Sequence, residues 1–337
     1  MSQTAFGLVL LVLAGAMNGS FALPMKFTRK WAWENTWLVW TLFALFILPI
    51  ALSFATVPDL MDLYRQPGAA AIAAGVAAFG FFWGLSQVFL GLAVDGVGMA
   101  LSFAVILGLS AAVGSLVPLI RDHPEQIATR GGMAVIAGVV IVLVGVAICG
   151  AAGKMREKVA AESHKISVAK GLFFCAISGV GSAFVNLGLT HGHPLVTKAA
   201  AAGASANSDN NAAWLPLMVA GGIPNLAYCF YLMNKNRTHG RLLLPGTAQH
   251  WPLAATMALF WFGSTVIYGV AANNMGDLGT IIGWPIFMSL IVMAATFWGV
   301  VTGEWKQAGP RPLRILALGV AVLVISIFVL SAASRMV

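Results

Sequence analysis

Ten runs of about 20 mostly apolar residues, separated by short polar segments, dominate this sequence of 337 residues. An α-helix rises about 1.5 Å per residue, so a run of this length crosses the roughly 30 Å hydrocarbon core of a bilayer. Backbone groups in lipid must be hydrogen-bonded within the chain, so each run is predicted to be helical. The predicted spans are residues 4–23, 36–55, 69–92, 97–120, 132–151, 170–189, 213–233, 254–273, 279–301 and 313–333.

The composition supports a membrane protein. Hydrophobic residues make up 59% of the chain and charged residues 9%, and the mean hydropathy is +0.88. A water-soluble domain of this length needs more charge to cover its surface. The longest interval between spans, 190–212, has room for a short surface helix but not for a folded domain. We therefore predict an all-α membrane protein with ten transmembrane helices.

The basic residues predict an orientation. Of the 19 lysines and arginines, 14 lie in or beside the loops that follow the odd-numbered spans. Because basic loops stay in the cytoplasm, both termini are predicted to be periplasmic. The net charge of +8 reflects this asymmetry. Lysines and arginines of 154–170 alternate with Glu157 and Glu162, which is typical of a solvated linker near anionic lipid and not of a nucleic-acid-binding face.

The chain divides at the charged linker, residues 152–169, into two halves, 1–151 and 170–337, with five spans each. An odd number of spans makes the second half insert upside down relative to the first. This is the inverted-repeat design of secondary transporters, which bind substrate near the membrane midplane. A faint pattern repeats at matching offsets: Gly7-Leu8, Gly15 and Asn18 in the first span, and Gly171-Leu172, Gly179 and Ser182 in the sixth.

Small residues, prolines and cysteines within the spans indicate packing. Gly80 and Gly84 form a small-xxx-small pair that predicts close contact with another helix. Pro224 and Pro285 lie inside spans, where proline frees a carbonyl and kinks a helix. All three cysteines of the chain fall within predicted spans, so they are expected to be buried thiols rather than a disulfide.

Four local segments together resemble a known family. They are FALPMKFTRKWAWENTW after the first span, FFWGLSQVFLGLAVDGVGMA in and after the third, GGIPNLAYCF in the seventh and GEWKQAGPRP after the ninth. In order and spacing, nearly the whole chain is similar to the L-rhamnose–proton symporter family of the drug/metabolite transporter superfamily. The resemblance implies two inverted five-helix halves with a cavity between helices 1–4 and 6–9. It also implies import of L-rhamnose or a related deoxy sugar with protons across the bacterial inner membrane.

Polar and aromatic residues within the spans suit sugar recognition, because hydroxyls need donors and acceptors and a pyranose face stacks on an aromatic ring. For any one of these residues the alternative role is interhelical hydrogen bonding or anchoring at the membrane interface. Gln87 and Asn225 are the strongest candidates, since an amide deep in a span has several hydrogen bonds to satisfy. The predicted substrate-binding residues are Asn18, Trp83, Gln87, Ser182, Asn186, Asn225, Trp261, Tyr268 and Trp284.

Proton coupling needs a group that gains and loses a proton during the cycle, typically a carboxylate whose pKa burial raises. Asp277, Asp95 and Glu34 are the candidates, and each sits at a span end, where a hydrated charge or helix cap is the alternative. Asp277 ranks first because it lacks a nearby basic residue and lies on the predicted outer side. Glu34 has Lys30 one turn earlier, which favours an ion pair. The remaining end-of-span candidates, with gating or structural roles, are Pro24, Lys26 and Glu304.

The sequence lacks the residues that an intramembrane enzyme, a metal site or an ATP-driven protein would need. The six histidines lie in loops or at span ends, so an intramembrane hydrolase has no base, and we predict no enzyme. His191 and His193 form a pair without further ligands nearby, so no metal is predicted. The sequence contains no glycine-rich phosphate-binding motif, so coupling to ATP is not predicted. No cofactor is expected. Export or transport of another polar metabolite is the alternative function. The sequence leaves the oligomeric state open, with a homodimer among the arrangements it allows.

Overall fold

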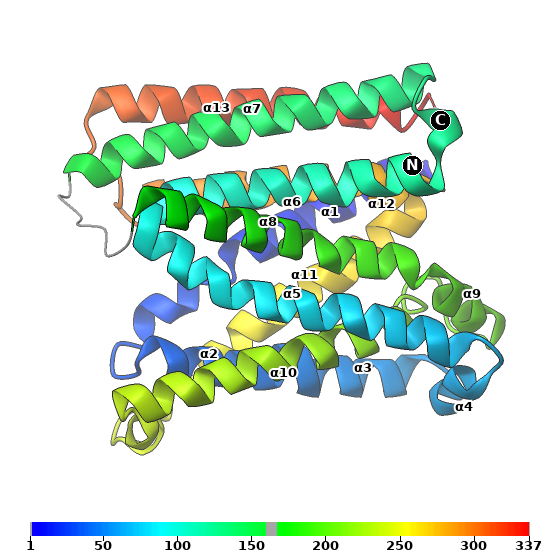
Figure 1. The fold of residues 1–337 in the computed structure, drawn as a ribbon, viewed down its shortest axis with the longest axis horizontal. Helices are drawn as coiled ribbons and strands as arrows, with labels where there is room; N and C mark the ends of the chain where they lie inside the picture. The colour runs from blue at the N-terminus through cyan, green and yellow to red at the C-terminus, as the bar shows by residue number, and fades with distance from the viewer. Residues whose placement is uncertain (1, 160–166, 337) are drawn as a thin grey trace. The chain divides into compact units, whose positions relative to one another are not determined.

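The computed structural model describes residues 2–159 and 167–336, with only the backbone for Asp95, Lys158 and Val159. Within this part every regular element is a helix (Figure 1). The longer helices are α1 (Gln3–Ser20), α5 (Ala69–Val97), α6 (Met99–Asp122), α7 (Arg130–Val159), α8 (Val168–His191), α10 (Asn211–Asn236), α11 (His250–Asn274), α12 (Gly279–Val301) and α13 (Pro310–Ala333). The shorter ones are η1 (Leu23–Phe27), α2 (Trp33–Thr41), η2 (Leu42–Ile47), α3 (Leu48–Thr56), α4 (Leu60–Arg65), η3 (Pro124–Gln126), α9 (His193–Ala201) and η4 (His239–Leu243).

The predicted helical spans are confirmed. Within the described residues, ten stretches are long and apolar enough to cross a membrane, and each overlaps one predicted span. The bounds move mainly where a helix continues past its apolar run: α5 reaches Val97, and α7 extends to Val159, so that its last two turns occupy the beginning of the charged segment 152–169. The interval 190–212 contains the short helix α9, as expected.

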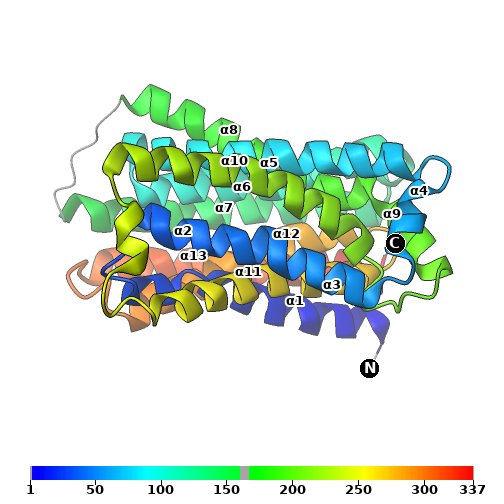
Figure 2. The ribbon, with the colours of Figure 1, turned by 90° about the horizontal axis from the view of Figure 1, so that it is seen from below.

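The second span is continuous but not regular. α2, η2 and α3 follow one another without a break (Figure 2), and η2 is a π-helical stretch. Pro49 lies in the first turn of α3 and has no backbone N–H to donate. A π-helical turn just before it absorbs the resulting change in hydrogen bonding, as such turns do within α-helices.

The chain forms two compact units. The boundaries between them fall inside α1, α5, α8 and α11, so these helices contribute to both. Unit 1 consists of Met1–Gly19, Ser86–Asn186 and Ala271–Val337, and unit 2 consists of Ser20–Leu85 and Leu187–Val270.

Small residues allow the helices of unit 1 to approach closely. α7 and α13 run side by side (Figure 1), with Gly138 and Gly145 of α7 under leucine side chains of α13. A Cβ added to Gly145 would lie 2.7 Å from a methyl of Leu323, which is closer than packed atoms approach. Bilayers supply no hydrophobic force between helices, so this close packing is what holds the pair together.

Glycine contacts also organise unit 2, and they confirm the predicted small-xxx-small pair. A methyl group on Gly80 or Gly84 of α5 would overlap backbone atoms of Leu217 or Gly221 in α10. Outside the spans, the Tyr64 hydroxyl of α4 donates to the carbonyl oxygen of Ala212 at the start of α10 (2.7 Å). Burial raises the pKa of Tyr64, which keeps this hydroxyl protonated and able to donate.

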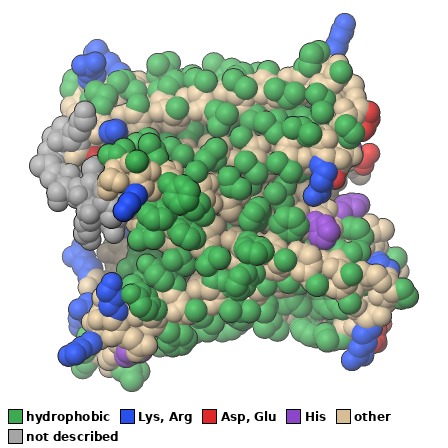
Figure 3. Space-filling view, in the orientation of Figure 1, with side chains coloured by type: hydrophobic (Ala, Val, Ile, Leu, Met, Phe, Trp, Pro, Cys, Tyr) green, Lys and Arg blue, Asp and Glu red, His purple; other side chains and the backbone are tan. Residues whose placement is uncertain are grey.

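The outward surface of α7 and α13 is apolar. Hydrophobic side chains cover most of the length of both helices, and lysines and arginines lie near helix ends (Figure 3). Exposed members include Val140 and Val144 of α7 and Ile325 and Phe328 of α13. Exposed apolar rows of this length face lipid in membrane proteins, in agreement with the predicted membrane spans.

Candidate functional site

Four tryptophans of unit 2 form a continuous aromatic group. The rings of Trp83 (α5) and Trp261 (α11) are stacked, with centroids 5.3 Å apart and planes 18° apart. Trp40 (α2) meets Trp261 edge-on, with ring centroids 5.2 Å apart, and the centroids of Trp37 and Trp40 are 4.4 Å apart. Two predicted substrate-binding residues, Trp83 and Trp261, therefore come together. We call Trp37, Trp40, Trp83 and Trp261 the tryptophan group.

The predicted amide Asn225 belongs to the same site. Its side-chain nitrogen donates to the carbonyl oxygen of Gly221, one turn earlier in α10 (2.9 Å), and its oxygen accepts from Trp37 Nε1 (3.3 Å). Trp83 lies against Gly221, where an added Cβ would be 2.6 Å from the ring. Aromatic faces beside a buried amide are a suitable surface for one face and one hydroxyl of a sugar ring.

Parts of the tryptophan group reach the surface of unit 2. Trp40 and Trp83 are buried, whereas Trp37 and Trp261 are partly exposed. Trp40 Nε1 is buried and has no hydrogen-bond partner in the described part of the chain. Tyr268, two turns after Trp261 on α11, is fully buried. Within the tryptophan group, Trp37 and Trp261 are therefore the rings that keep some accessible surface.

In unit 1, the structure brings Gln87 and Ser182 together. Gln87 Nε2 of α5 lies 3.4 Å from Ser182 Oγ of α8 and 3.3 Å from Ser86 Oγ. Gly181 allows this approach, because a Cβ there would overlap the Ser86 side chain. These bonds are long for N–H···O contacts, so the Gln87 amide can exchange them at little cost.

Asn186 and Trp284, also in unit 1, donate to backbone carbonyls. Asn186 Nδ2 donates to the carbonyl oxygens of Gly114 (2.8 Å) and Thr280 (3.1 Å), and it is fully buried. Trp284 Nε1 donates to Ser110 O (2.9 Å). These bonds join α6, α8 and α12, and this geometry favours the interhelical role that was the alternative for both residues. Asn18, the other candidate in this unit, is buried in α1.

The buried Glu34 forms a hydrogen-bonded clasp in unit 2. It lies in the first turn of α2, where a carboxylate suits the helix dipole. Its Oε1 accepts from Nδ2 of Asn236, the last residue of α10 (3.0 Å), and from Oγ1 of Thr238 in the loop that follows (2.8 Å). The adjacent Asn35 Nδ2 donates to Thr238 O (3.0 Å). Lys30, the partner suggested by sequence, instead donates to Pro245 O (2.8 Å). We call Glu34, Asn236 and Thr238 the Glu34 clasp.

The other coupling candidates lie at helix ends. Asp277 is exposed in the turn between α11 and α12, two residues before α12 begins. Asp95 lies in the last turn of α5, and its side chain is outside the described part of the structure. Pro24 opens η1, and the exposed Lys26 follows it in the same short helix.

Glu304 forms an ion pair at the end of unit 1. Arg156 Nη1, near the end of α7, lies 3.0 Å from Glu304 Oε2 in the connection between α12 and α13. The Arg156 guanidinium also sits over the Trp305 ring, 5.1 Å from its centroid. The neighbouring Glu157 is buried and accepts from the backbone N–H of Ala100 in the first turn of α6 (2.7 Å). The ion pair shows where the Glu304 carboxylate lies, and its gating or structural role stays a prediction.

Several residues of these sites were not predicted. Trp37 and Trp40 are spaced three apart on one helical face, which is a signal that the sequence does contain. Asn236 ends α10 and Thr238 lies in the polar loop that follows, and nothing in the sequence around them signals a contact with Glu34. Glu157 lies in the charged segment that was interpreted as a solvated linker. In the structure its carboxylate instead accepts a hydrogen bond from the first turn of α6.

The helices bury polar groups and tryptophans between them and turn apolar faces outward. This arrangement is typical of a class of proteins, the polytopic membrane transporters. Comparison with known proteins places the chain within that class. The family model for L-rhamnose-proton symport protein matches residues 1–334, and the chain belongs to this family. It is a family of symport proteins rather than enzymes, and with its ten apolar helices this chain is a multi-pass inner-membrane protein.

Relatives of similar length support the assignment. An L-rhamnose-proton symporter of Cronobacter sakazakii is 28% identical over 328 residues, which cover 95% of each chain. Proteins with the same description from Klebsiella pneumoniae and Salmonella dublin are 27% and 28% identical over 323 residues, covering 94% of each chain. The similarity thus extends over both halves of the chain.

Proposed function

We propose that this protein imports L-rhamnose or a related deoxy sugar together with protons, by alternating access. Family membership over residues 1–334 carries the proposal. The tryptophan group with Asn225 supports it, because a deoxy sugar offers an apolar face for stacking and a small number of hydroxyls for an amide. Gln87 and Ser182 are proposed as further hydroxyl-binding groups in unit 1.

The transport reaction can be tested directly. Purified protein in proteoliposomes with an inward proton gradient should accumulate radiolabelled L-rhamnose above its external concentration. Dissipating the gradient with a protonophore should abolish accumulation but leave exchange. Accumulation of another polar metabolite in place of deoxy sugars, or outward transport, would favour the alternative of a different carrier or an exporter.

For coupling we propose Asp277 first, then Asp95. Asp277 is exposed at the predicted outer side, where it can exchange protons with water, whereas Glu34 accepts two hydrogen bonds within its clasp. Asp277→Asn should abolish accumulation driven by the proton gradient and leave sugar exchange. Glu125→Gln, at an exposed acid in another loop on the same predicted side, is the matched control. Retained accumulation in Asp277→Asn would move the role to Asp95.

The inverted repeat is proposed from the composition of the two units. Unit 2 takes the larger parts of the second, third, seventh and eighth spans, and unit 1 takes those of the other six. Each unit therefore combines corresponding spans of the two halves, 1–151 and 170–337. Two halves with the same fold, inserted in opposite directions, account for this correspondence.

We propose that both termini are periplasmic, from the distribution of lysine and arginine. A cysteine introduced near the C-terminus should react with an impermeant thiol reagent in intact cells. The three native cysteines are buried, so background labelling from them is low. Labelling only after lysis would reverse the orientation. A homodimer stays a prediction that the mass of the purified protein in detergent can test.

A further inference from the structure

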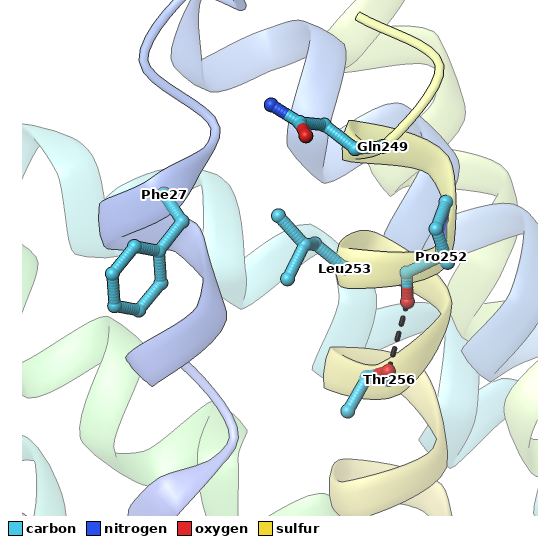
Figure 4. A pocket seen from close by; sticks show the side chains of 5 residues that line it. All are labelled: Phe27, Gln249, Pro252, Leu253 and Thr256. Carbon is cyan, nitrogen blue, oxygen red and sulfur yellow. Dashed lines mark hydrogen bonds between the residues drawn. The ribbon is translucent and has the colours of Figure 1, made fainter.

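A groove of about 440 Å³ lies in unit 2, between η1 and the first two turns of α11 (Figure 4). Leu253 projects from α11 toward Phe27 across the groove (Figure 4). Thr256 Oγ1 donates to Pro252 O within α11 (2.8 Å), so this hydroxyl is already hydrogen-bonded. The lining residues are Phe27, Gln249, Pro252, Leu253 and Thr256.

The groove is surrounded by exposed apolar side chains at the ends of spans. Phe27 is 61% exposed and is the last residue of the first span, and Trp251 at the start of α11 is 38% exposed. Leu243, between α10 and α11, is 86% exposed. Exposed aromatic and leucine side chains at this position are typical of the interface between hydrocarbon and headgroups. A lipid chain is therefore the apolar occupant that this location supplies.

The charge beside the groove is positive. Lys26, Arg29 and Lys30 are exposed on the segment that carries Phe27. The bond from Lys30 Nζ to Pro245 O ties this segment to the connection that leads into α11, the other wall. The single acid of residues 20–56 is Glu34, which is buried in its clasp, and residues 236–258 contain no acid.

We propose that this groove binds an anionic phospholipid, with an acyl chain between Phe27 and Leu253 and the phosphate near Lys26 and Arg29. A zwitterionic lipid gains the apolar contact but little from the charges, since its headgroup is neutral overall. Basic side chains at a span end attract anionic lipid headgroups in this way. The apolar lining and its few polar groups, one of them already hydrogen-bonded within α11, do not suit a sugar ring, which needs several paired hydroxyls.

The test titrates the full-length protein in detergent with phosphatidylglycerol or phosphatidylcholine of the same acyl chains, and native mass spectrometry measures the bound fraction. The wild type should retain phosphatidylglycerol more tightly. Lys26→Gln with Arg29→Gln should weaken that retention about 25-fold, which is ~2 kcal/mol at ~1.4 kcal/mol per tenfold. Phe27→Ala, at an exposed position, should weaken binding of both lipids several-fold.

The matched control is Arg311→Gln with Arg314→Gln, which removes the same charge from exposed positions in the first turns of α13. This control should leave retention unchanged. Equal binding of the two lipids by the wild type would overturn the proposal, as would an equal loss in the control. No effect of Phe27→Ala would also overturn it, because the acyl chain would then lie elsewhere. Arg29→Gln alone provides a milder variant if the double substitution lowers the melting temperature.

Discussion

The Glu34 clasp of unit 2 and the Arg156–Glu304 ion pair of unit 1 both join residues that are far apart in the chain. Glu34 and Asn236 are 202 residues apart, and Arg156 and Glu304 are 148 apart. In the clasp, Glu34 and Thr238 are buried, 4% and 3% exposed, whereas Asn236 lies at the surface. The ion pair has its arginine 24% and its glutamate 42% exposed.

This difference in burial decides what each contact contributes. A buried donor that loses its acceptor keeps its full desolvation cost, whereas exposed partners recover water. Exposed ion pairs are therefore worth little, even when their geometry is good. We infer that the clasp holds the start of α2 to the end of α10 rigidly, while the ion pair is a contact that a conformational cycle can break and remake cheaply.

The largest effect is expected from Glu34→Ala. The substitution removes two hydrogen bonds to a buried carboxylate and leaves the buried Thr238 hydroxyl without its acceptor, which should destabilise the protein by about 3 kcal/mol. A thiol-reactive dye can follow thermal unfolding in detergent, because all three cysteines are buried until the protein unfolds. Asp62→Ala, which removes a partner from an exposed pair, is the control and should have little effect. A Glu34→Ala variant as stable as this control would show that the clasp does not hold unit 2 together.

Gly84→Ala should break the packing of unit 2 without touching a charge. The added methyl overlaps Gly221 O of α10, so α5 and α10 must separate, at a cost of about 2 kcal/mol. Gly91→Ala is a matched control on the same helix, since nothing lies within 4 Å of an added Cβ there. It should be neutral or slightly stabilising, because alanine favours helix. Equal melting temperatures for the two variants would contradict the close contact.

Two amide substitutions extend the comparison to sugar binding. Asn225→Ala in unit 2 should weaken L-rhamnose binding by about 1–2 kcal/mol, because it removes an amide beside the tryptophan group. Gln87→Ala in unit 1 should have an effect of similar or smaller size, since its present bonds are long. Isothermal titration with the purified protein measures both, and unchanged melting temperatures are the control for folding. Unaltered affinity in both variants would reduce these residues to packing.

The smallest effect is expected from Arg156→Gln. Loss of a half-exposed ion pair and one cation–π contact should cost about 1 kcal/mol or less. The effect should shrink at high salt, because screening weakens the wild-type pair, whereas the Glu34→Ala effect should not. Melting temperatures of both variants at low and high salt test this contrast. A large, salt-independent loss in Arg156→Gln would mean that the two contacts are equivalent.

Much of the fold could be predicted because it depends on local properties. An apolar run of this length predicts a helix that spans a bilayer, and the prediction does not depend on which neighbours the helix contacts. Gly80 and Gly84 were expected to meet a helix, and they meet α10. Ends of helices were less predictable: α7 continues into charged residues, and there Glu157 accepts from the backbone N–H of Ala100 in α6.

The candidate site was predictable as a list of residue types but not as a set of contacts. Trp83, Trp261 and Asn225 were selected with Asn186 and Trp284 by the same rule, that polar or aromatic groups within spans need partners. The structure separates them by what they bond. Trp83 and Trp261 stack in the tryptophan group, whereas Asn186 and Trp284 donate to carbonyls of neighbouring helices.

The sequence alone determined that this protein is a ten-helix membrane protein with a resemblance to sugar–proton symporters. Hydropathy, glycine spacing and motif order are properties of the sequence itself, so they can be recognised without knowing which distant residues are in contact. Only the tertiary structure decided that Glu34 bonds to Asn236 and Thr238 rather than Lys30, and that Trp40 completes the aromatic group. A hydrogen bond or ring contact depends on which residue, often some 200 positions away, reaches the same point in space.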